Sequence, residues 1–399
     1  MQSTALRFSG SVIPYQGIIE PISTVVLAVL QKANSRNSEL GKQSLVKKRQ
    51  QIEAPLISSR TSKTQKSRHI KIGSIRMRAI IIKQFGGLDS LVIENLPDPV
   101  PKPGSVLIEV KAFGINHAET HMRKGEWAEA ATVSGIECVG LVKSCPGGEF
   151  AAGTKVAAFM GGLGRTINGS YAEYTCPPAT NVVPINTDLA WEDFAVIPES
   201  YATAWTCLHR NLEIKRGQIL VIRGATSALG RAALNIAAEA GAHIIATTRK
   251  KERFETLLEL GAHRAEIETP KLSQSIAEQK QIDAVLDLVG NTTFMDSLSM
   301  LRRGGRMCLA GWLGGLDPVD NFNPLLQMPS GVYFTFFGSF VFGTPDFPVS
   351  DIPFQSIVDK VAKGVYKAKP ARVFRFDDIR EAHEAMESNQ ANGKMVVRI

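Results

Sequence analysis

One segment constrains the fold more than any other: a buried strand, a glycine turn and a small-residue helix that follow one another without a gap. The strand is 218–223 (QILVIR), the turn carries Gly224, and the alanine-rich helix covers 227–240. A strand that passes directly into a helix is the start of a βαβ unit. The free N–H groups at the start of such a helix, together with its dipole, bind phosphate. The sequence therefore predicts a parallel sheet with a dinucleotide site at this turn.

Each small residue of this turn has a predicted role. Gly224 permits the tight turn, Ser227 and Ala228 let a phosphate approach the backbone, and Gly230 lets the helix pack on the strand. The strict G-x-G-x-x-G pattern is not met, so an ordinary βα turn is the alternative. Six residues of the turn are predicted to bind the cofactor: Gly224, Thr226, Ser227, Ala228, Leu229 and Gly230.

The next strand, 243–248 (HIIATT), ends where the ribose of the cofactor is recognised. An NAD site usually carries an acid about 20 residues beyond the glycines. This chain has no acid between Glu239 and Glu252 and offers cations instead. Cations suit the 2′-phosphate of NADP, so NADP(H) is the predicted cofactor. The alternative is that these cations are only the exposed first turn of the next helix. The predicted ligands are Thr248, Arg249 and Lys250.

The pattern along the chain changes near residue 200. Before it, short alternating strands with glycine- and proline-rich turns indicate a β-rich domain. After it, strands alternate with helices of about 10–15 residues, which is typical of a doubly wound parallel sheet. The fold class predicted from this pattern is α/β, with a β-rich domain beside a parallel-sheet domain.

The first 76 residues differ from the rest in charge. They hold 13 Lys/Arg and 3 Asp/Glu, whereas 77–399 hold 33 and 35, so the net charge of +8 comes from the extension. We expect a disordered basic extension at 1–76 and no specific nucleic-acid binding by the body. A mitochondrial presequence is the alternative for the extension. The apolar run 22–30 is shorter than the roughly 20 residues that span a bilayer, so no membrane span is predicted.

The five cysteines are scattered at positions 138, 145, 176, 207 and 308, and no two have C-x2-C spacing. This pattern argues against a disulfide scaffold and against a cysteine-rich zinc site, and it fits a reducing compartment. We therefore expect a cytoplasmic protein, or a mitochondrial one if the extension contains a presequence.

The order of the segments resembles the medium-chain dehydrogenase/reductase superfamily over residues 77–399. The resemblance is carried by YATAW at 201–205, the turn GATSALG at 224–230 and NGKMVV at 392–397. In the last of these, Lys394 is predicted to contact the cofactor. The resemblance implies two domains: a β-rich GroES-like catalytic domain at 77–200 and 340–399, and a Rossmann NADP-binding domain at 201–339.

Zinc alcohol dehydrogenases of this superfamily carry a cysteine and a histidine where this chain has Asn116 and Ile136. Neither residue is a zinc ligand at neutral pH, so no metal is predicted. The chain thus resembles the zinc-free branch, the quinone oxidoreductases. Those enzymes often carry tyrosines where this chain has His121 and Trp127, so a tyrosine donor does not carry over.

The activity that the resemblance implies is hydride transfer from NADPH to a quinone or an α,β-unsaturated carbonyl. Without zinc, hydrogen-bond donors must stabilise the negative charge that develops on the carbonyl oxygen. The predicted catalytic residues are Asn116, His121 and Thr203, and a protonated His121 would also act as a general acid. The alternatives are that Asn116 caps a helix together with Glu119 and that His121 is an exposed helix residue.

Two strand ends and an aromatic segment complete the predicted site. The strands that end in DLVG at 287–290 and LAGW at 309–312 place Val289 and Gly311 near the nicotinamide half of the cofactor. The aromatic segment 332–343 is predicted to be an edge strand that pairs two subunits into a homodimer, with Phe337 lining the pocket. A flat apolar wall for the substrate and a buried interior strand are the alternatives.

Three functions follow from these observations. The first is an NADPH-dependent reductase of small-molecule quinones or enones. The second is an enoyl-thioester reductase that acts on coenzyme A or carrier-protein substrates. The third is an NADPH-binding module with little turnover.

Overall fold

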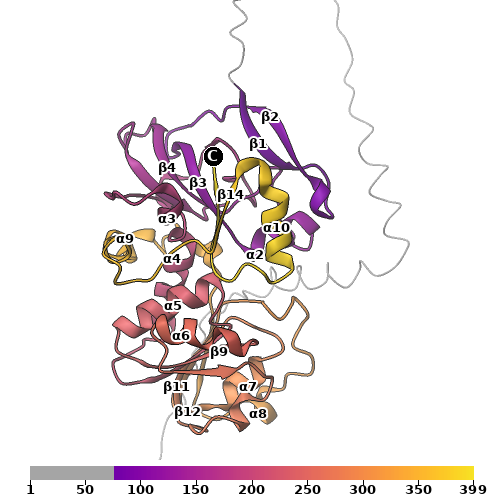
Figure 1. Cartoon of the computed structure of the whole chain (residues 1–399), viewed down its shortest axis with the longest axis vertical. Coiled ribbons are helices and arrows are strands. Elements are labelled where there is room, and N and C mark those ends of the chain that lie inside the picture. The colour runs from indigo at the N-terminus through magenta and orange to yellow at the C-terminus, as the bar shows by residue number, and fades with distance from the viewer. Residues whose placement is uncertain (1–75) are drawn as a thin grey trace, which may run out of the picture. The chain divides into compact units, whose positions relative to one another are not determined.

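The computed structural model describes residues 76–399, whose strands form three sheets (Figure 1). The predicted extension lies outside the described residues apart from Arg76, which begins the first strand. We call the six-stranded sheet with its helices the parallel lobe, and the seven-stranded sheet with its hairpin the antiparallel lobe. In Figure 1 the indigo and yellow ends of the described chain share the antiparallel lobe, and the middle of the chain forms the parallel lobe.

Every neighbouring pair in the six-stranded sheet is parallel, in the order β10-β9-β8-β11-β12-β13. Its strands are β8 (Ile219–Arg223), β9 (His243–Thr248), β10 (Arg264–Ile267), β11 (Ile282–Asp287), β12 (Leu301–Leu309) and β13 (Tyr333–Phe336). Apolar runs such as ILVI in β8 suit central strands that are covered on both faces. The order reverses between β8 and β11, the point where such sheets bind ligands. The predicted doubly wound parallel sheet is confirmed.

The antiparallel lobe joins distant parts of the sequence. Its larger sheet has the order β14-β15-β3-β4-β5-β7, with β6 also paired to β3, and all pairs except β14–β15 are antiparallel. The last strand of the chain therefore pairs with β3. The bounds are β3 (Leu107–Ile115), β4 (Glu137–Ser144), β5 (Lys155–Phe159), β6 (Tyr174–Thr175), β7 (Val182–Pro184), β14 (Arg372–Arg375), β15 (Met395–Arg398), and, in the hairpin, β1 (Arg76–Ile82) and β2 (Leu91–Pro97).

The α-helices connect and cover these sheets. The helix predicted after the glycine turn begins one residue beyond Ser227, whose Oγ accepts the N–H of Gly230 at 3.0 Å and so caps the helix. The bounds are α2 (His117–Lys124), α3 (Trp191–Phe194), α4 (Pro198–Thr206), α5 (Ala228–Glu239), α6 (Phe254–Glu259), α7 (Phe294–Ser299), α8 (Pro324–Gln327), α9 (Phe354–Ala362) and α10 (Ile379–Glu387).

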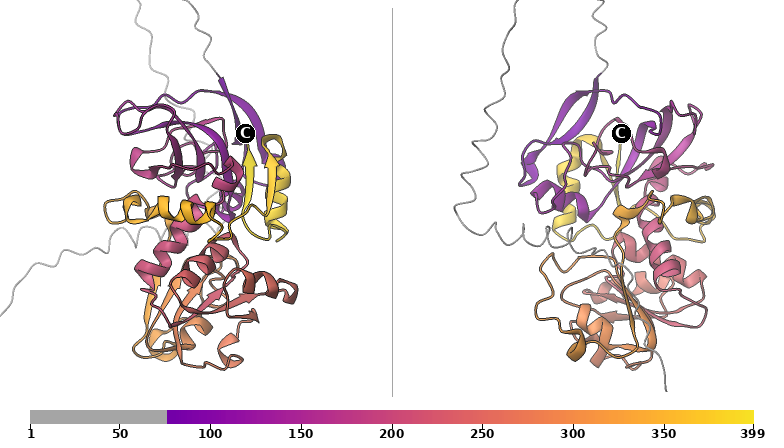
Figure 2. Two further views of the ribbon diagram at one scale, coloured as in Figure 1. Left: turned by 60° about the vertical axis from the view of Figure 1, so that its left-hand side comes forward. Right: turned by 180° about the vertical axis from the view of Figure 1, so that it is seen from behind.

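One apolar core crosses from lobe to lobe. It contains Val139 and Phe159 of the antiparallel lobe, Ala202 of α4, and Leu220 and Leu234 of the parallel lobe, all fully buried. Both views in Figure 2 show helical segments between the two sheets. Because burial of apolar area stabilises the protein by about 25 cal/mol per Å², this shared core fixes the lobes to each other more firmly than a linker would.

Strand β10 was not predicted, because its four residues, RAEI, carry two charges and show little apolar alternation. The domain limits at residues 200 and 340 remain a prediction.

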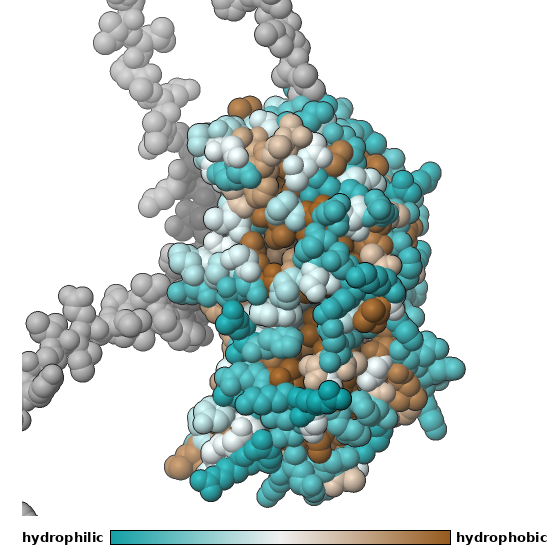
Figure 3. Space-filling model, turned by 90° about the vertical axis from the view of Figure 1, so that its left-hand side faces the viewer, coloured by the Kyte–Doolittle hydropathy of each residue, from teal (hydrophilic) through white to brown (hydrophobic). Residues whose placement is uncertain are grey.

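The face drawn in Figure 3 is mostly hydrophilic, with apolar residues interspersed. Large apolar side chains that are strongly exposed include those of Leu325, Leu326 and Tyr333. Among residues 76–399, none of the helices combines the length and the apolar character that crossing a bilayer requires.

Candidate active site

A cleft of about 1130 Å³ runs between the two lobes. Its floor includes residues at the carboxyl ends of four parallel strands, namely Gly224, Thr248, Val289 and Gly311. Helices α2 and α4 line its other end through Asn116, His121 and Thr203. The cleft therefore brings together residues from Ile115 to Gly393 of the sequence.

The glycine turn has the geometry of a phosphate site. Gly224 adopts a φ of 73°, and a Cβ there would lie 2.9 Å from Leu313 Cδ1, so only glycine fits without strain. In the described hydrogen bonds, the N–H groups of Ala228 and Leu229 at the start of α5 have no acceptor, and both residues line the cleft. These donors and the helix dipole suit the pyrophosphate of a dinucleotide.

Gly230 is the exception among the six residues predicted for the turn. It does not line the cleft, because it packs behind the turn, where a Cβ would lie 2.6 Å from Ala225 Cα. Gly230 lets the helix and the strand approach each other, and its contact with the cofactor stays a prediction. Gly224, Thr226, Ser227, Ala228 and Leu229 do line the cleft.

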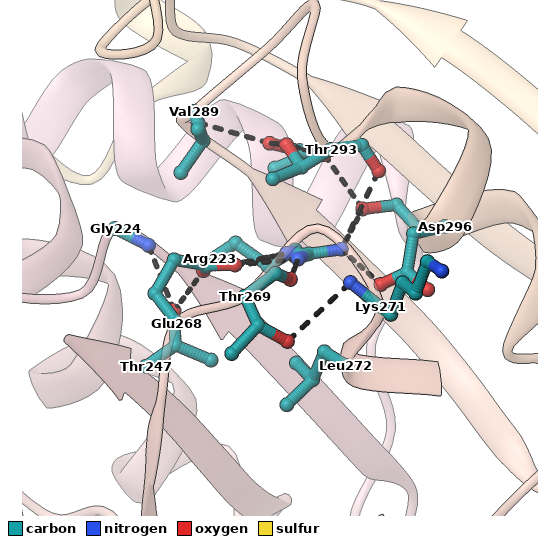
Figure 4. A network of polar contacts seen from close by, with 12 residues as sticks. Arg223, Gly224, Thr247, Glu268, Thr269, Lys271, Leu272, Val289, Thr293 and Asp296 are labelled. Atoms are coloured by element: carbon teal, nitrogen blue, oxygen red, sulfur yellow. Dashed lines mark hydrogen bonds and ion pairs between the residues drawn. The ribbon is translucent and has the colours of Figure 1, made fainter. Parts of the chain in front are cut away.

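A buried charge cluster supports this turn from below (Figure 4). Arg223, fully buried at the end of β8, donates to Glu268 and Thr269 after β10 and to Asp296 of α7. The Nη1–Oδ2 distance to Asp296 is 2.7 Å. Thr247 links the cluster to the turn: its hydroxyl donates to Glu268 and accepts the N–H of Gly224 at 3.1 Å. The sequence analysis did not predict this cluster, because its members are far apart in the sequence and come together only in the fold.

The predicted cationic end of the cleft exists, and it includes residues from both lobes. Thr248, Arg249 and Lys250 line it. Arg249 Nη2 donates to Asn389 Oδ1 at 2.9 Å, across from the antiparallel lobe. Arg253, which also lines the cleft, donates to Thr226 Oγ1 at 3.4 Å. Arg249 and Lys250 are exposed and directly precede the 3-10 turn Lys251–Arg253, and their binding of a 2′-phosphate stays a prediction.

A second buried cluster lies at the opposite end. Lys394 Nζ donates to Asn116 Oδ1 at 2.6 Å and forms an ion pair with Glu137, and both charged side chains are buried. A Cβ on Gly114 would lie 2.3 Å from Lys394 Cε, so a larger residue there would displace the Lys394 side chain from the cluster. Lys394 does not line the cleft but bonds to Asn116, which does, and its contact with the cofactor stays a prediction.

The amide nitrogen and the amide oxygen of Asn116 both form hydrogen bonds within this cluster. Its Nδ2 donates to Glu137 at 2.9 Å and to Glu119 at 3.3 Å, while Oδ1 accepts from Lys394. The two carboxylates on one side and the ammonium on the other fix the amide orientation. Glu119 Oε2 also accepts the backbone N–H of Asn116 at 2.6 Å, as the capping alternative predicts. The role of Asn116 toward a substrate stays a prediction.

His121 lies in the cleft with its Nδ1 bonded to Glu126 and its ring stacked parallel to Trp127, at a centroid distance of 6.0 Å. The neighbouring His117 also lines the cleft, and burial lowers its pKa to about 4, so it is neutral near pH 7. His117 therefore has no proton to donate from a charged ring near neutral pH.

Thr203 of α4 lines the cleft and donates from Oγ1 to Glu199 Oε1 at 3.0 Å. Glu199 also lines the cleft, and sequence reasoning missed it. The only signal was an acid inside an otherwise apolar segment, FAVIPESYATAW. Burial raises the pKa of Glu199, and burial raises that of Glu119 to about 7. This end of the cleft therefore holds carboxyl groups that retain protons more readily than exposed ones.

The remaining predicted residues also line the cleft. The N–H of Val289 donates to Asp287 Oδ1 at 2.9 Å, which shapes the loop after β11. A Cβ on Gly311 would lie 2.6 Å from the carbonyl oxygen of Leu288, so glycine allows the close approach of these loops. Phe337 is buried and presents an apolar wall. Their contacts with a cofactor or substrate stay predictions.

Two family models match the chain. Residues 102–187 match the alcohol dehydrogenase GroES-like domain, and residues 228–354 match the zinc-binding dehydrogenase domain. The first match lies in the antiparallel lobe, and most of the second lies in the parallel lobe. The predicted combination of a GroES-like and a Rossmann-like domain is confirmed.

Curated relatives match over most of the chain. The human quinone oxidoreductase is 27% identical over 342 residues, which are 82% of this chain and 98% of that protein. A 2-haloacrylate reductase from a Burkholderia species is 26% identical over 333 residues, 80% of this chain and 98% of that protein. Both matches extend through the two lobes.

Solved structures share the fold. The quinone oxidoreductase from Coxiella burnetii is 21% identical with a TM-score of 0.70, and covers 82% of this chain and all of its own. A mycobacterial protein solved in complex with NADPH is 24% identical with a TM-score of 0.71, and covers 81% of this chain and all of its own. At these identities the likeness concerns the fold.

Proposed function

Because the chain belongs to the medium-chain dehydrogenase/reductase family as a quinone oxidoreductase-like oxidoreductase, we propose that it uses NADPH to reduce a quinone or an α,β-unsaturated carbonyl compound without zinc. When bound, the nicotinamide supplies the hydride. The chain's own residues bind and orient the two reactants and exclude water. The name of the Burkholderia relative specifies an α,β-unsaturated acid, which supports including such acids among the substrates.

The observation that carries this proposal is the cationic end of the cleft. Arg249, Lys250 and Arg253 line it, and the segment after β9 has no acid before Glu252. A ribose 2′-hydroxyl is usually held by a carboxylate, whereas a 2′-phosphate needs cations. The free N–H groups of α5 fit the pyrophosphate of the same molecule. The cleft therefore supports NADPH rather than NADH.

The other end of the cleft supports chemistry without zinc. Asn116 and Ile136 stand where zinc alcohol dehydrogenases have ligands, and neither side chain is a good zinc ligand. The ammonium of Lys394 already neutralises Glu137 and bonds to Asn116. A second cation at this place would be repelled by the first, so charge stabilisation here must come from hydrogen bonds.

The walls between the two ends favour a flat apolar substrate. Ile136, Met160, Trp127 and Phe337 line this part of the cleft. Such walls exclude water from the reacting carbon and strengthen the electrostatic interactions near it. His121 and Thr203 are the proposed donors to the substrate oxygen, and Asn116 acts by holding the helix that carries His121.

The test is NADPH oxidation by the full-length protein after treatment with a chelator. The acceptors are a panel of quinones, enones, 2-chloroacrylate and one enoyl-thioester, with NADH as the control donor. Turnover of quinones or enones with NADPH, undiminished by the chelator, is the expected result. Turnover of the thioester alone would favour the enoyl-thioester reductase, and tight NADPH binding without oxidation would favour the binding module. Activity that disappears with the chelator would contradict the zinc-free chemistry.

We also propose that two copies of the chain pair through β13. This strand is the edge of the six-stranded sheet, and the side chains of Tyr333, Phe334 and Phe336 are between 40% and 55% exposed. An exposed aromatic edge strand is a template for pairing with a second copy. Sedimentation velocity should show a dimer, and Tyr333→Lys should shift it toward the monomer.

For the compartment we propose the cytoplasm, and cell fractionation tests it.

A further inference from the structure

The geometry of Asn116 raises the question of which group protonates the substrate oxygen. Hydride transfer to an electron-poor carbon leaves a negative oxygen that must gain a proton. Both N–H groups of the Asn116 amide are donated to Glu137 and Glu119, so the amide has none to offer. Among the remaining candidates in the cleft, Thr203 has a hydroxyl whose Oγ1 donates to Glu199 Oε1 at 3.0 Å. Unlike the amide, this hydroxyl can rotate, so it can accept from a protonated Glu199 and turn its own O–H to a substrate.

The Thr203–Glu199 pair is built into one helix turn. The residues are four positions apart on α4, so their side chains lie on the same face, and Thr203 Oγ1 is 3.0 Å from Glu199 Oε1. Both residues line the cleft. The backbone N–H of Glu199 donates to Glu137 Oε2 at 2.8 Å, which ties the start of α4 to the Lys394 cluster. The pair therefore has a fixed position beside the substrate end of the cleft.

We propose that Glu199 is the acid that protonates the substrate oxygen, through the hydroxyl of Thr203. This inference rests on the proposed function, because it assigns the proton donor for that reaction. Thr203 is the catalytic residue that touches the substrate, and Glu199 acts through it.

The step balances in atoms and charge. A bound reduced nicotinamide would supply the hydride for the new C–H bond and, with it, two electrons. The Thr203 O–H bond breaks as its proton passes to the substrate oxygen. The Glu199 carboxyl O–H bond breaks in turn and restores the Thr203 hydroxyl. Glu199 is then a carboxylate. It takes a proton from water through the open cleft once the product is released.

The surroundings of Glu199 suit a group that exchanges a proton. Burial raises its pKa, the charge of Lys394 opposes the shift, and the charge of Glu137 on β4 adds to it. Thr203 on its own helix and Ser339 beyond β13 also bond to it and favour the charged form. The acid form is thus more populated near neutral pH than that of an exposed glutamate, while Lys394 stabilises the carboxylate left after the transfer.

The experiment compares four variants with the wild type over a pH series, with the best acceptor of the panel. Glu199→Gln keeps the size but has no acidic proton, and Thr203→Val keeps the shape but has no hydroxyl. Thr203→Ser restores the hydroxyl. Thr206→Val, on the same helix with its hydroxyl bonded to the Ala202 carbonyl and outside the cleft, is the matched control.

The expected losses follow from the size of general-acid catalysis, which is about 10²- to 10⁴-fold. Glu199→Gln and Thr203→Val should each lower kcat by about 100-fold or more. Combining them should cost little more than either alone, because both remove the same step. Thr203→Ser should stay within a few-fold of the wild type and Thr206→Val should match it. The fall in wild-type activity with rising pH should be absent in Glu199→Gln.

A second measurement separates this inference from the proposed function. The dissociation constant for NADPH, measured by fluorescence without an acceptor, should be the same in all variants. If the wild type reduces an acceptor and Glu199→Gln keeps its kcat and pH profile, the inference is wrong and the proposed function stands. If the wild type reduces none of the acceptors, both are wrong. If Glu199→Gln loses NADPH binding, the glutamate is structural and the inference is overturned.

Discussion

A buried cation lies near each end of the cleft, Arg223 in the parallel lobe and Lys394 in the antiparallel lobe, and the two have different hydrogen-bond partners. Arg223 in the parallel lobe bonds to two carboxylates, Glu268 and Asp296, and to the carbonyl of Thr269. Lys394 in the antiparallel lobe bonds to one carboxylate, Glu137, and to the amide of Asn116. Burial alone would lower the pKa of Arg223, but the hydrogen bond and charge of Glu268 outweigh it and raise the pKa.

Because of this difference, the two clusters have different roles at the two ends of the cleft. The guanidinium of Arg223 can bond in several directions at once, so it joins the end of β8 to the segment after β10 and to α7 beneath the dinucleotide turn. The single ammonium of Lys394 leaves neighbouring carboxyls, such as Glu119, with fewer countercharges, and burial raises the pKa of Glu119 to about 7. The Arg223 cluster therefore fixes the backbone of the dinucleotide turn. The Lys394 cluster lies among carboxyl groups that retain protons at the proposed substrate end of the cleft.

The largest expected effect is that of Arg223→Met. The change leaves Glu268 and Asp296 buried without their cation, which should cost about 5 kcal/mol of unfolding free energy, the upper end for a broken buried pair. Arg223→Lys keeps the charge but cannot reach every partner, and should cost about 1–2 kcal/mol. Urea unfolding measures both. Equal stability of Arg223→Met and the wild type would refute the structural role of this cluster.

Lys394→Met should cost less, about 3 kcal/mol of unfolding free energy, because only one carboxylate loses its cation. Glu137 still accepts from Asn116 Nδ2 and from the N–H of Glu199, which reduces the penalty. The double variant Lys394→Met with Glu137→Gln removes both charges and should regain most of the loss. If the double variant is less stable than Lys394→Met alone, the pair is not the source of the effect.

The sequence predicted the nucleotide end of the cleft much better than the reacting end. The turn at Gly224 and the cations at Arg249 are local patterns, in which strand, turn and helix follow in order. The contact between Lys394 and Asn116 joins residues 278 positions apart, and nothing near either residue in the sequence indicates the other. Glu199 was missed for the same reason, since its burial depends on the packing of α4 against the antiparallel lobe. The parallel sheet was predictable because the alternation of strands and helices is also a local pattern, whereas the order of the strands in the sheet was not predicted.

A lower pH should reduce the stability of the antiparallel lobe through one buried histidine. His383 of α10 is buried beside Arg123, with its Nε2 at 3.1 Å from Tyr171 Oη, and burial lowers its pKa to about 3. Its unfolded pKa is about 6.5, so the native state binds fewer protons. Stability from this group is complete above pH 6.5 and is lost as the pH falls toward 3.

The measurement is the difference in unfolding free energy between the wild type and His383→Phe. From pH 7.5 to pH 4.5, the wild type should lose about 2–3 kcal/mol more than the variant. Glu119, whose raised pKa acts in the opposite direction between about 4.5 and 7, contributes equally to both proteins and cancels. Parallel pH curves for the two proteins would contradict a neutral buried His383. Hydrogen exchange should place the loss in α2 and α10.

The smallest expected effect concerns a cation that is not buried in a cluster. Arg249 lies at the surface of the cleft, and its bond to Asn389 can be exchanged for a phosphate. Arg249→Ala should weaken NADPH binding by about 10- to 100-fold, equivalent to about 1.5–3 kcal/mol for a charged hydrogen bond. NADH lacks the 2′-phosphate, so its affinity should stay nearly constant, and the unfolding free energy should hardly change. Lys251→Ala, a neighbouring cation outside the cleft, is the control. Equal losses for both cofactors would mean that Arg249 acts on the fold of the pocket, as Arg223 does, and not on the phosphate.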